Sequence, residues 1–321
     1  MENYLITGAS GFVSAHFLNY LETNAVQANV MGLDLNEPEF STDGFRNVKF
    51  EFQRVDLLNV SQVNEVLEKF RPDYVLHLAS YSSVAFSWQN PIVSFTNNTN
   101  IFLNILEQLR LKEIRCRIVS VGSSEEYGNF AASDLPLKES HHLNPLSPYA
   151  VARVAQELLS NVYNRGYKTD IVLTRSFNHI GPGQRPVFVV ASFAKKLNDI
   201  KKGRIHSAEF STGDLSIVRD FVDVRDVVRA YYLLLKKGES GEVYNICSGK
   251  GISLAELLRR MAEIAGVEIN PVLNPFFSRP DDNRIIIGSN EKIKRAVNWT
   301  NEIDIETSFR DIIAYFGNLT D

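Results

Sequence analysis

The stretch SPYAVAR (147–153) places a tyrosine and an arginine four residues apart. Ser147 and Pro148 are typical of a helix N-cap and a first helical residue, so Tyr149 and Arg153 are expected one turn apart on the same helix face. A tyrosine can donate a proton to a carbonyl near neutral pH only if a neighbouring positive charge stabilises its phenolate. Arg153 can supply that charge. The alternative is an ordinary surface pair on an amphipathic helix.

A serine stands at the end of the strand-like run RIVSVG (117–122). Side chains at the carboxyl ends of parallel strands reach the ligand crevice of a doubly wound sheet, and Ser123 occupies such a position. Its hydroxyl can bond the carbonyl oxygen that Tyr149 would protonate. A loop serine without a chemical role is the alternative.

A glycine-containing turn follows the first strand-like run, YLIT (4–7). In TGASGFVS (7–14), Gly8 and Gly11 allow the backbone to turn sharply and to approach a pyrophosphate at the N-terminus of the next helix. Ser14 occupies the third glycine position of this pattern and is small enough for the helix to pack on the strand. The turn predicts a dinucleotide site, with a mere tight turn as the alternative.

Aspartates end the next two strand-like runs. Asp34 lies about 20 residues beyond the turn, where a carboxylate bonds the adenine ribose hydroxyls and repels a 2′-phosphate. Asp56, followed by Leu57, stands where a carboxylate can reach the adenine amino group. Each aspartate is explained equally well as a loop or helix cap. Asp34 favours NAD, but the chain does not decide between NADH and NADPH, so we expect NAD(P)H.

Short apolar or β-branched runs alternate with longer helical patterns as far as Arg175. This alternation predicts an α/β protein with a Rossmann-type, doubly wound parallel sheet. The Gly/Pro stretch FNHIGPGQRP follows, and the later strand VYNIC indicates a return to the sheet. We expect helices at 12–22, 61–70, 92–110, 148–163, 188–201, 253–265, 289–297 and 305–316, and a strand–helix pair at 217–236.

Composition limits the possible partners. The 321 residues are 44% hydrophobic and carry a net charge of −4 without a basic cluster, so we expect a globular protein that does not bind nucleic acid. No apolar run reaches the roughly 20 residues that cross a bilayer. A strand pattern begins almost at once, so we expect no membrane association and a cytoplasmic location. The six histidines and two cysteines are too dispersed to predict a metal site.

Five motifs, in order, resemble the extended short-chain dehydrogenases/reductases that act on nucleotide sugars, and the resemblance covers nearly the whole chain. The motifs are TGASGFVS (7–14), HLAS (77–80), SSEEYG (123–128), SPYAVAR (147–153) and RDFVDVRD (219–226). The resemblance implies that Tyr149 is the catalytic acid or base and that Ser123 orients the sugar carbonyl. It also implies that Arg153 replaces a lysine that binds the nicotinamide ribose.

The same resemblance implies a Rossmann domain with a smaller, interleaved C-terminal lobe for the nucleotide sugar. We expect residues 1–176 and about 214–248 in the NAD(P)-binding domain, and about 177–213 and 249–321 in the lobe. The resemblance also implies a homodimer formed through a four-helix bundle of the helices at 92–110 and 148–163.

Arginine in place of lysine has a chemical consequence. Its guanidinium stays charged and presents a planar fork, so stabilisation of a phenolate and hydrogen bonds to ribose can survive. Arginine does not deprotonate in proteins, so it cannot relay a proton from solvent as lysine can. We therefore expect a working but slower enzyme; the alternative is an inactive relative.

One branch of this family is most similar to the stretch TRSFNHIGPGQ (174–184) and the segments after it. This branch contains the GDP-mannose 4,6-dehydratases and the reductases of GDP-4-keto-6-deoxymannose. Within it, the chain is more similar to the reductases, which make GDP-D-rhamnose. Substrate contacts implied by this resemblance fall on Asn178, Val189, Ser192, Arg219, Arg279 and Asp282. Ser83 follows the fourth strand, where it can touch the sugar or only cap the next helix. Arg185 follows the Gly/Pro stretch, where it can close over the substrate, but the chain does not decide this. Cofactor contacts implied by it, beyond those argued above, fall on Ser10, Phe12, Val13, Leu78, Ala79, Ser80, Asn98 and Ile180.

Glu125 argues for a different reaction. In the dehydratases a glutamate at this place removes the proton next to the keto group, which a reductase does not need to do. A nucleotide-sugar dehydratase is therefore the first alternative and a 4-epimerase the second. A non-catalytic NAD(P)-binding sensor is an alternative of another class, supported by Arg153 and opposed by Tyr149 with Ser123.

Overall fold

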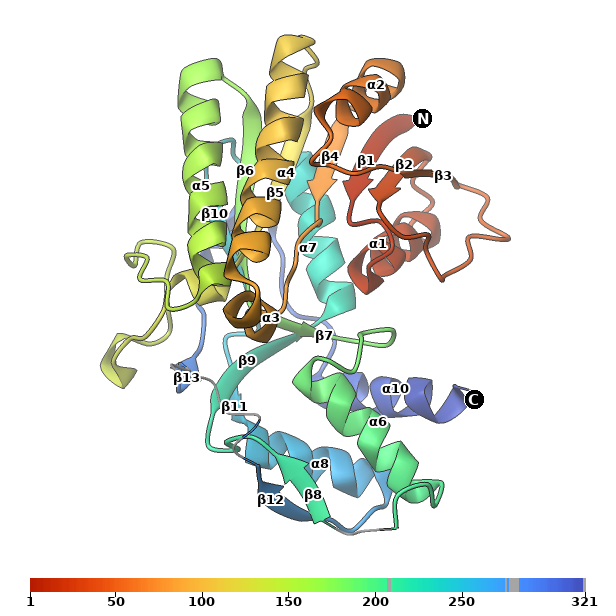
Figure 1. The fold of residues 1–321 in the computed structure, drawn as a ribbon, viewed down its shortest axis with the longest axis vertical. Coiled ribbons are helices and arrows are strands. Elements are labelled where there is room, and N and C mark those ends of the chain that lie inside the picture. Colours follow the sequence, from red (N-terminus) through yellow and green to blue (C-terminus); the bar gives the residue numbers. More distant parts are fainter. Residues whose placement is uncertain (207–208, 275, 277–282, 320–321) are drawn as a thin grey trace.

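A seven-stranded parallel sheet lies at the centre of the larger of two parts of the molecule (Figure 1). The computed structural model describes residues 1–206, 209–274, 276 and 283–319. In sheet order the strands are β10 (Val243–Ile246), β6 (Asp170–Ser176), β5 (Arg117–Ser123), β4 (Tyr74–His77), β1 (Glu2–Thr7), β2 (Ala28–Asp34) and β3 (Val48–Arg54). The order reverses between β1 and β4. The carboxyl ends of these two strands therefore form the switch point at which such sheets bind ligands.

Helices cover both faces of this sheet because its strands are apolar on both sides. In β1, Tyr4 and Ile6 belong to one core cluster and Leu5 to the other. The first face packs against α1 (Phe12–Thr23), α7 (Val224–Lys237) and α9 (Glu291–Val297). The second packs against α2 (Val60–Phe70), α4 (Pro91–Leu111) and α5 (Pro148–Tyr167). The predicted doubly wound α/β fold is confirmed.

A smaller lobe lies beside the carboxyl edge of the sheet (Figure 1). Its central strand is β9 (Val218–Asp223), which pairs with β7 (Asn178–Ile180), β11 (Gly251–Ser253) and β13 (Ile285–Ile286). Strands β8 (Glu209–Thr212) and β12 (Asn270–Leu273) form a separate parallel pair. Three helices share one apolar core: α6 (Val189–Lys201), α8 (Leu254–Ala265) and α10 (Ile305–Asn318).

The chain passes between the sheet and the lobe more than once. We expected residues 214–248 in the nucleotide-binding part. Within that stretch α7 packs on the large sheet and β10 is its edge strand, whereas β9 lies in the lobe and pairs there with three strands. Short elements complete the fold: α3 (Val84–Gln89), η1 (Ser124–Glu126) and η2 (Ala132–Asp134). Within the described residues, no helix is long and apolar enough to cross a membrane.

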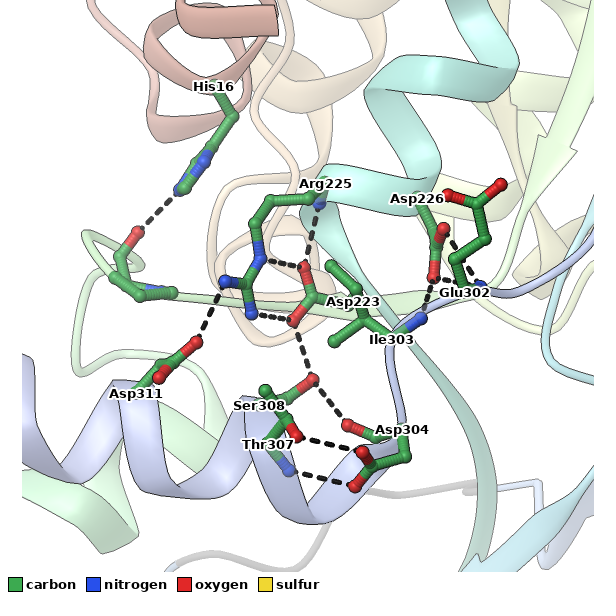
Figure 2. Close-up of polar contacts among 11 residues, drawn as sticks. His16, Asp223, Arg225, Asp226, Glu302, Ile303, Asp304, Thr307, Ser308 and Asp311 are labelled. Atoms are coloured by element: carbon green, nitrogen blue, oxygen red, sulfur yellow. Dashed lines mark hydrogen bonds and ion pairs between the residues drawn. The ribbon is translucent and has the colours of Figure 1, made fainter.

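The lobe is joined to α7 by a buried carboxylate at the end of β9. Asp223 accepts hydrogen bonds from Nε and Nη2 of Arg225, both at 2.8 Å, and from Oγ of Ser308 on α10 at 2.6 Å. Arg225 also pairs with Asp311 of α10 at 2.8 Å. Figure 2 shows how these side chains connect α10 to the first turn of α7.

A second carboxylate, in the first turn of α7, binds the segment that leads into α10. Asp226 is 2% exposed, and its Oδ2 accepts the backbone N–H groups of Glu302 and Ile303, both at 3.0 Å (Figure 2). Arg229 donates to its Oδ1 at 3.0 Å. The DVRD part of RDFVDVRD thus attaches the lobe to the nucleotide-binding half.

Candidate active site

The turn between β1 and α1 forms the cofactor end of the site. Gly8 has a φ of +72°, and a Cβ there would lie 2.8 Å from the backbone nitrogen of Ala79, so a side chain would prevent the turn from approaching the loop after β4. Oγ1 of Thr7 accepts the Ala79 N–H at 3.2 Å and ties the two loops together. Gly11 is the N-cap of α1 and provides no side chain to cap its first N–H groups. Such a helix start suits a pyrophosphate.

The two predicted adenosine ligands lie at the ends of β2 and just after β3. Asp34 Oδ2 accepts hydrogen bonds from the N–H and hydroxyl of Ser10, at 3.1 and 2.7 Å, so the carboxylate is fixed against the glycine turn. Its Oδ1 accepts the N–H of Leu35 at 2.7 Å. Asp56 accepts the N–H of Leu58 at 2.9 Å. Both carboxylates therefore accept hydrogen bonds from loop groups near the ends of their strands. Both also line the cavity described below.

Tyr149 and Arg153 lie in the first two turns of α5, as predicted. Oγ of Ser147 accepts the N–H of Ala150 at 3.1 Å and caps the helix, with Pro148 at its first position. Nε of Arg153 lies 3.3 Å from the Tyr149 hydroxyl. The two residues are only 6% and 4% exposed, which contradicts a surface pair. A permanent cation is thus held beside a buried phenol.

Ser123 and two glutamates form the third part of the site. Oγ of Ser123 accepts the N–H of Glu125 at 3.2 Å, and a hydroxyl that accepts one bond still has its own proton to donate. Glu126 turns away into the core, where its Oε1 accepts the Ser123 N–H at 2.6 Å. Burial and the neighbouring Glu157 raise the pKa of Glu126 well above its usual range. Glu125, in contrast, lines the cavity.

One cavity of about 730 Å³ connects these groups, a size typical of small-molecule sites. It extends from the glycine turn past the ends of β4 and β5 to the start of α5 and to the lobe. Most of the predicted site residues line it: Gly8, Ser10, Gly11, Phe12, Val13, Asp34, Asp56, Leu57, Leu78, Ala79, Ser80, Ser83, Ser123, Glu125, Tyr149, Arg153, Asn178, Ile180, Arg185 and Val189.

Three predicted site residues within the described part of the chain do not line the cavity. Asn98 is fully buried on α4, where its side chain bonds both backbone groups of Tyr81, at 2.8 and 3.2 Å, and so holds the loop after β4. Ser192 lies on α6. Arg219 is 6% exposed on β9. The predicted ligands Arg279 and Asp282 lie outside the described residues.

The cavity also includes side chains that the sequence did not reveal. His179 stacks on Phe12 with 5.8 Å between ring centroids, and Gln184 donates to the His179 carbonyl at 2.9 Å. Tyr231 of α7 contacts Ser176 through their hydroxyl oxygens, 2.8 Å apart. His179 and Gln184 lie within FNHIGPGQ and could have been proposed from that motif. Tyr231 has no local signal, because only the return of α7 to the sheet brings it here.

The protein has a doubly wound sheet with a glycine turn at its switch point, and a tyrosine with a fixed cation beside it. These features define an NAD(P)-dependent enzyme of the extended short-chain dehydrogenase/reductase class. The chain belongs to the GDP-mannose 4,6-dehydratase family, whose model matches residues 5–312.

Individual relatives support this assignment. The chain is 33% identical over 313 residues to GDP-6-deoxy-D-mannose reductase from Pseudomonas aeruginosa, covering 98% of this chain and 96% of the relative. The structure of RMD from Pseudomonas aeruginosa complexed with NADPH superposes with a TM-score of 0.87 at 31% identity, covering 99% of each chain. UDP-glucose 4-epimerase from Thermus thermophilus, in complex with NAD, gives 0.85 at 29% identity and covers 99% of this chain and 100% of that one.

Proposed function

We propose that this protein reduces the 4-keto group of GDP-4-keto-6-deoxy-D-mannose with NAD(P)H and produces GDP-D-rhamnose. The observation that carries the proposal is the position of Tyr149, Arg153 and Ser123 in one cavity with the glycine turn and the lobe. The Pseudomonas relative named GDP-6-deoxy-D-mannose reductase supports the choice of substrate. NADPH and NAD in the two related structures support the choice of cofactor.

The reaction adds a hydride and a proton across the keto group. NAD(P)H, when bound in the cavity, would supply the hydride for the sugar C4. Tyr149 donates the proton to the keto oxygen, and Arg153, 3.3 Å from the phenol oxygen, stabilises the phenolate that remains. Ser123 donates a hydrogen bond to the same oxygen and polarises the carbonyl.

The residues of the cavity fit the cofactor. The N–H groups at the start of α1 would hold the pyrophosphate, Asp34 the adenine ribose and Asp56 the adenine, since all of these groups line the cavity. We assign residues 1–176 and about 214–248 to this function, apart from β9, which pairs within the lobe.

Asn178, Arg185 and Val189 are the lobe residues that we assign to the nucleotide diphosphate and base, since all three line the cavity. Ser83 caps α3 through Phe86 N–H at 3.2 Å and also lines the cavity, where its hydroxyl can meet the sugar. Arg219 and Ser192 remain predictions from the family resemblance. A location in the cytoplasm remains a prediction from the sequence pattern.

A homodimer is supported by the outer faces of α4 and α5. Apolar side chains that are 43–80% exposed follow these two helices: Ile92, Val93, Phe95, Leu111, Val151, Leu158, Val162 and Tyr167. Exposed apolar side chains on two neighbouring helices are typical of an interface. A second copy that packs the same two helices against it completes a four-helix bundle.

Dehydration of GDP-mannose is the second candidate, and Glu125 is the observation that favours it. Its position in the cavity beside Ser123 would suit a base that removes a proton next to the keto carbon. Dehydratases regenerate their cofactor within one catalytic cycle, whereas a reductase consumes NAD(P)H in every turnover.

The test is the fall in nicotinamide absorbance when purified protein meets GDP-4-keto-6-deoxymannose, with NADH and NADPH in parallel and GDP-mannose as the control. Oxidation that depends on the keto sugar supports the reductase. Conversion of GDP-mannose to a keto sugar without net oxidation makes the protein a dehydratase. No reaction with either sugar contradicts both candidates.

A further inference from the structure

Arg153 is held by another residue of its own helix. Its Nη1 donates to the side-chain oxygen of Gln156 at 2.6 Å and to the backbone carbonyl of Val121 at 3.0 Å. Gln156 is three residues further along α5, on the same buried face, and is 1% exposed. The cation of the site is therefore attached to β5 and α5 on the side away from Tyr149.

Gln156 is itself oriented by β5. Its Nε2 donates to Oγ of Ser120 at 2.8 Å and to the Val121 carbonyl at 3.2 Å. These two bonds direct the amide oxygen toward Arg153. Because a buried polar atom that loses its partner costs free energy, the orientation of the amide is strongly determined.

Each of the three nitrogens of the guanidinium therefore has a different environment. Nη1 faces Gln156 and Val121, and Nε faces the Tyr149 hydroxyl. Nη2 has no acceptor within the described part of the chain, and Arg153 lines the cavity. Nη2 is therefore the nitrogen of the guanidinium that is left to meet a ligand in the cavity.

The charge of Arg153 acts on titratable groups of neighbouring elements. These are His77 on β4 and Tyr231 on α7, besides Tyr149 on α5. Burial, with the Arg153 charge, lowers the pKa of His77 to about 3, so this imidazole is neutral at working pH. Burial raises the pKa of Tyr231, which is neutral as well.

We propose that Gln156 is a positioning residue for Arg153: by accepting Nη1 it directs Nε to Tyr149 and Nη2 to the ribose of the nicotinamide, and so adapts the site to arginine. A lysine carries one nitrogen, which cannot stand at the places of Nε, Nη1 and Nη2 together. The acceptors of Gln156 and Val121 would draw that ammonium toward β5 and away from Tyr149. This inference rests on the proposed function.

The experiment compares wild type with Gln156→Leu, Arg153→Lys and the double variant that carries both changes. Two quantities are measured: kcat with the keto sugar, and the affinity for NAD(P)H from nicotinamide fluorescence, which needs no turnover. Ser160→Ala is the matched control. This buried hydroxyl of α5 donates to the backbone carbonyl of Gln156 at 2.9 Å and lies 3.3 Å from Oγ of Ser120, but it contacts neither Arg153 nor the side-chain amide of Gln156.

We expect Gln156→Leu to lower kcat by about tenfold and to weaken NAD(P)H binding, with little change in KM for the sugar. Arg153→Lys should also be slower than wild type, and the double variant should be faster than Arg153→Lys. Ser160→Ala should keep kcat within about twofold. A Gln156→Leu variant that behaves like Ser160→Ala, or an Arg153→Lys variant as fast as wild type, overturns the inference.

Gln156→Glu keeps the test decisive if Gln156→Leu does not fold. The carboxylate still accepts Nη1 but partly neutralises Arg153, so we expect the basic limb of the pH profile of kcat to move to higher pH. An unmoved limb contradicts the inference. Absence of keto-sugar reduction by wild type contradicts the proposed function instead, and the NAD(P)H affinities then still decide whether Gln156 positions Arg153.

Discussion

The nucleotide-binding half and the lobe place their functional side chains by different means. In the first, each group lies within a few residues of a strand end or a helix start: Gly8 after β1, Ser123 at the end of β5, Tyr149 at the start of α5. In the lobe, three strands from separate parts of the chain pair with β9. Asp223 and Asp226 attach α10, and the segment that leads into it, to α7. Local motifs thus place the chemistry, and long-range polar contacts place the lobe.

Tyr149→Phe tests the local side of this comparison and has the largest expected effect. The phenol is the proposed proton donor, so its loss should lower kcat by about a thousandfold. NAD(P)H affinity and thermal stability should stay close to wild type, because only one hydroxyl is removed. Steady-state kinetics and fluorescence titration measure the two quantities. A variant that retains a tenth or more of the rate would show that another group donates the proton.

Asp226→Ala tests the long-range side. The change leaves Arg229 and the N–H groups of Glu302 and Ile303 without their buried acceptor, so we expect a loss of about 3 kcal/mol in the free energy of unfolding. Denaturant titration measures it.

Asp311→Ala is the matched control at the same joint. Asp311 pairs with Arg225 but is 38% exposed at its side chain, and exposed ion pairs contribute less than about 1 kcal/mol. If Asp226→Ala and Asp311→Ala lower the free energy of unfolding equally, the buried carboxylate of Asp226 is not what attaches the lobe.

Two histidines, the buried His77 and the half-buried His179, predict an acid sensitivity shared by both halves. Burial lowers the pKa of His77 to about 3 and that of His179 to about 4, from an ordinary value of 6.5. Both are neutral when folded, whereas the unfolded chain takes up protons below pH 6.5. Stability is therefore present above pH 6.5 and is lost as the pH falls toward 4, by up to about 1.4 kcal/mol per pH unit for each histidine.

The check is the free energy of unfolding from about pH 7 to about pH 5, with His179→Asn beside wild type. The variant lacks one of the two imidazoles, so its stability should fall less steeply with acid. A wild-type stability that rises on acidification would contradict neutral histidines in the folded protein.

Asp34→Ala has the smallest expected effect and concerns the cofactor alone. The carboxylate that bonds Ser10 would no longer repel a 2′-phosphate or bind a 2′-hydroxyl, so the ratio of NADPH to NADH affinity should rise by about fivefold. Asp56→Ala is the control, because adenine is common to both cofactors. An equal change in the two variants would place Asp34 away from the ribose.

Much of the nucleotide-binding half could be predicted from the sequence. The helix expected at 148–163 begins at Pro148 as predicted, and Arg153 does contact Tyr149. These predictions depend on strand and helix periodicity and on caps, which act over a few residues. Prediction was less complete in the lobe: β9 was expected with the other half.

The sequence by itself determined the class of this protein, because the glycine turn, Ser123 and the Tyr149–Arg153 spacing are local patterns that need no distant partner. Only the tertiary structure decided how Arg153 is oriented. The neighbouring strand β5 provides the Val121 carbonyl that accepts from Arg153 and the Ser120 hydroxyl that accepts from Gln156. The tertiary structure also decided where the lobe stands, because Asp223 and Asp226 bind groups about 75–85 residues away in the chain. Contacts over such separations depend on topology, which local propensity does not encode.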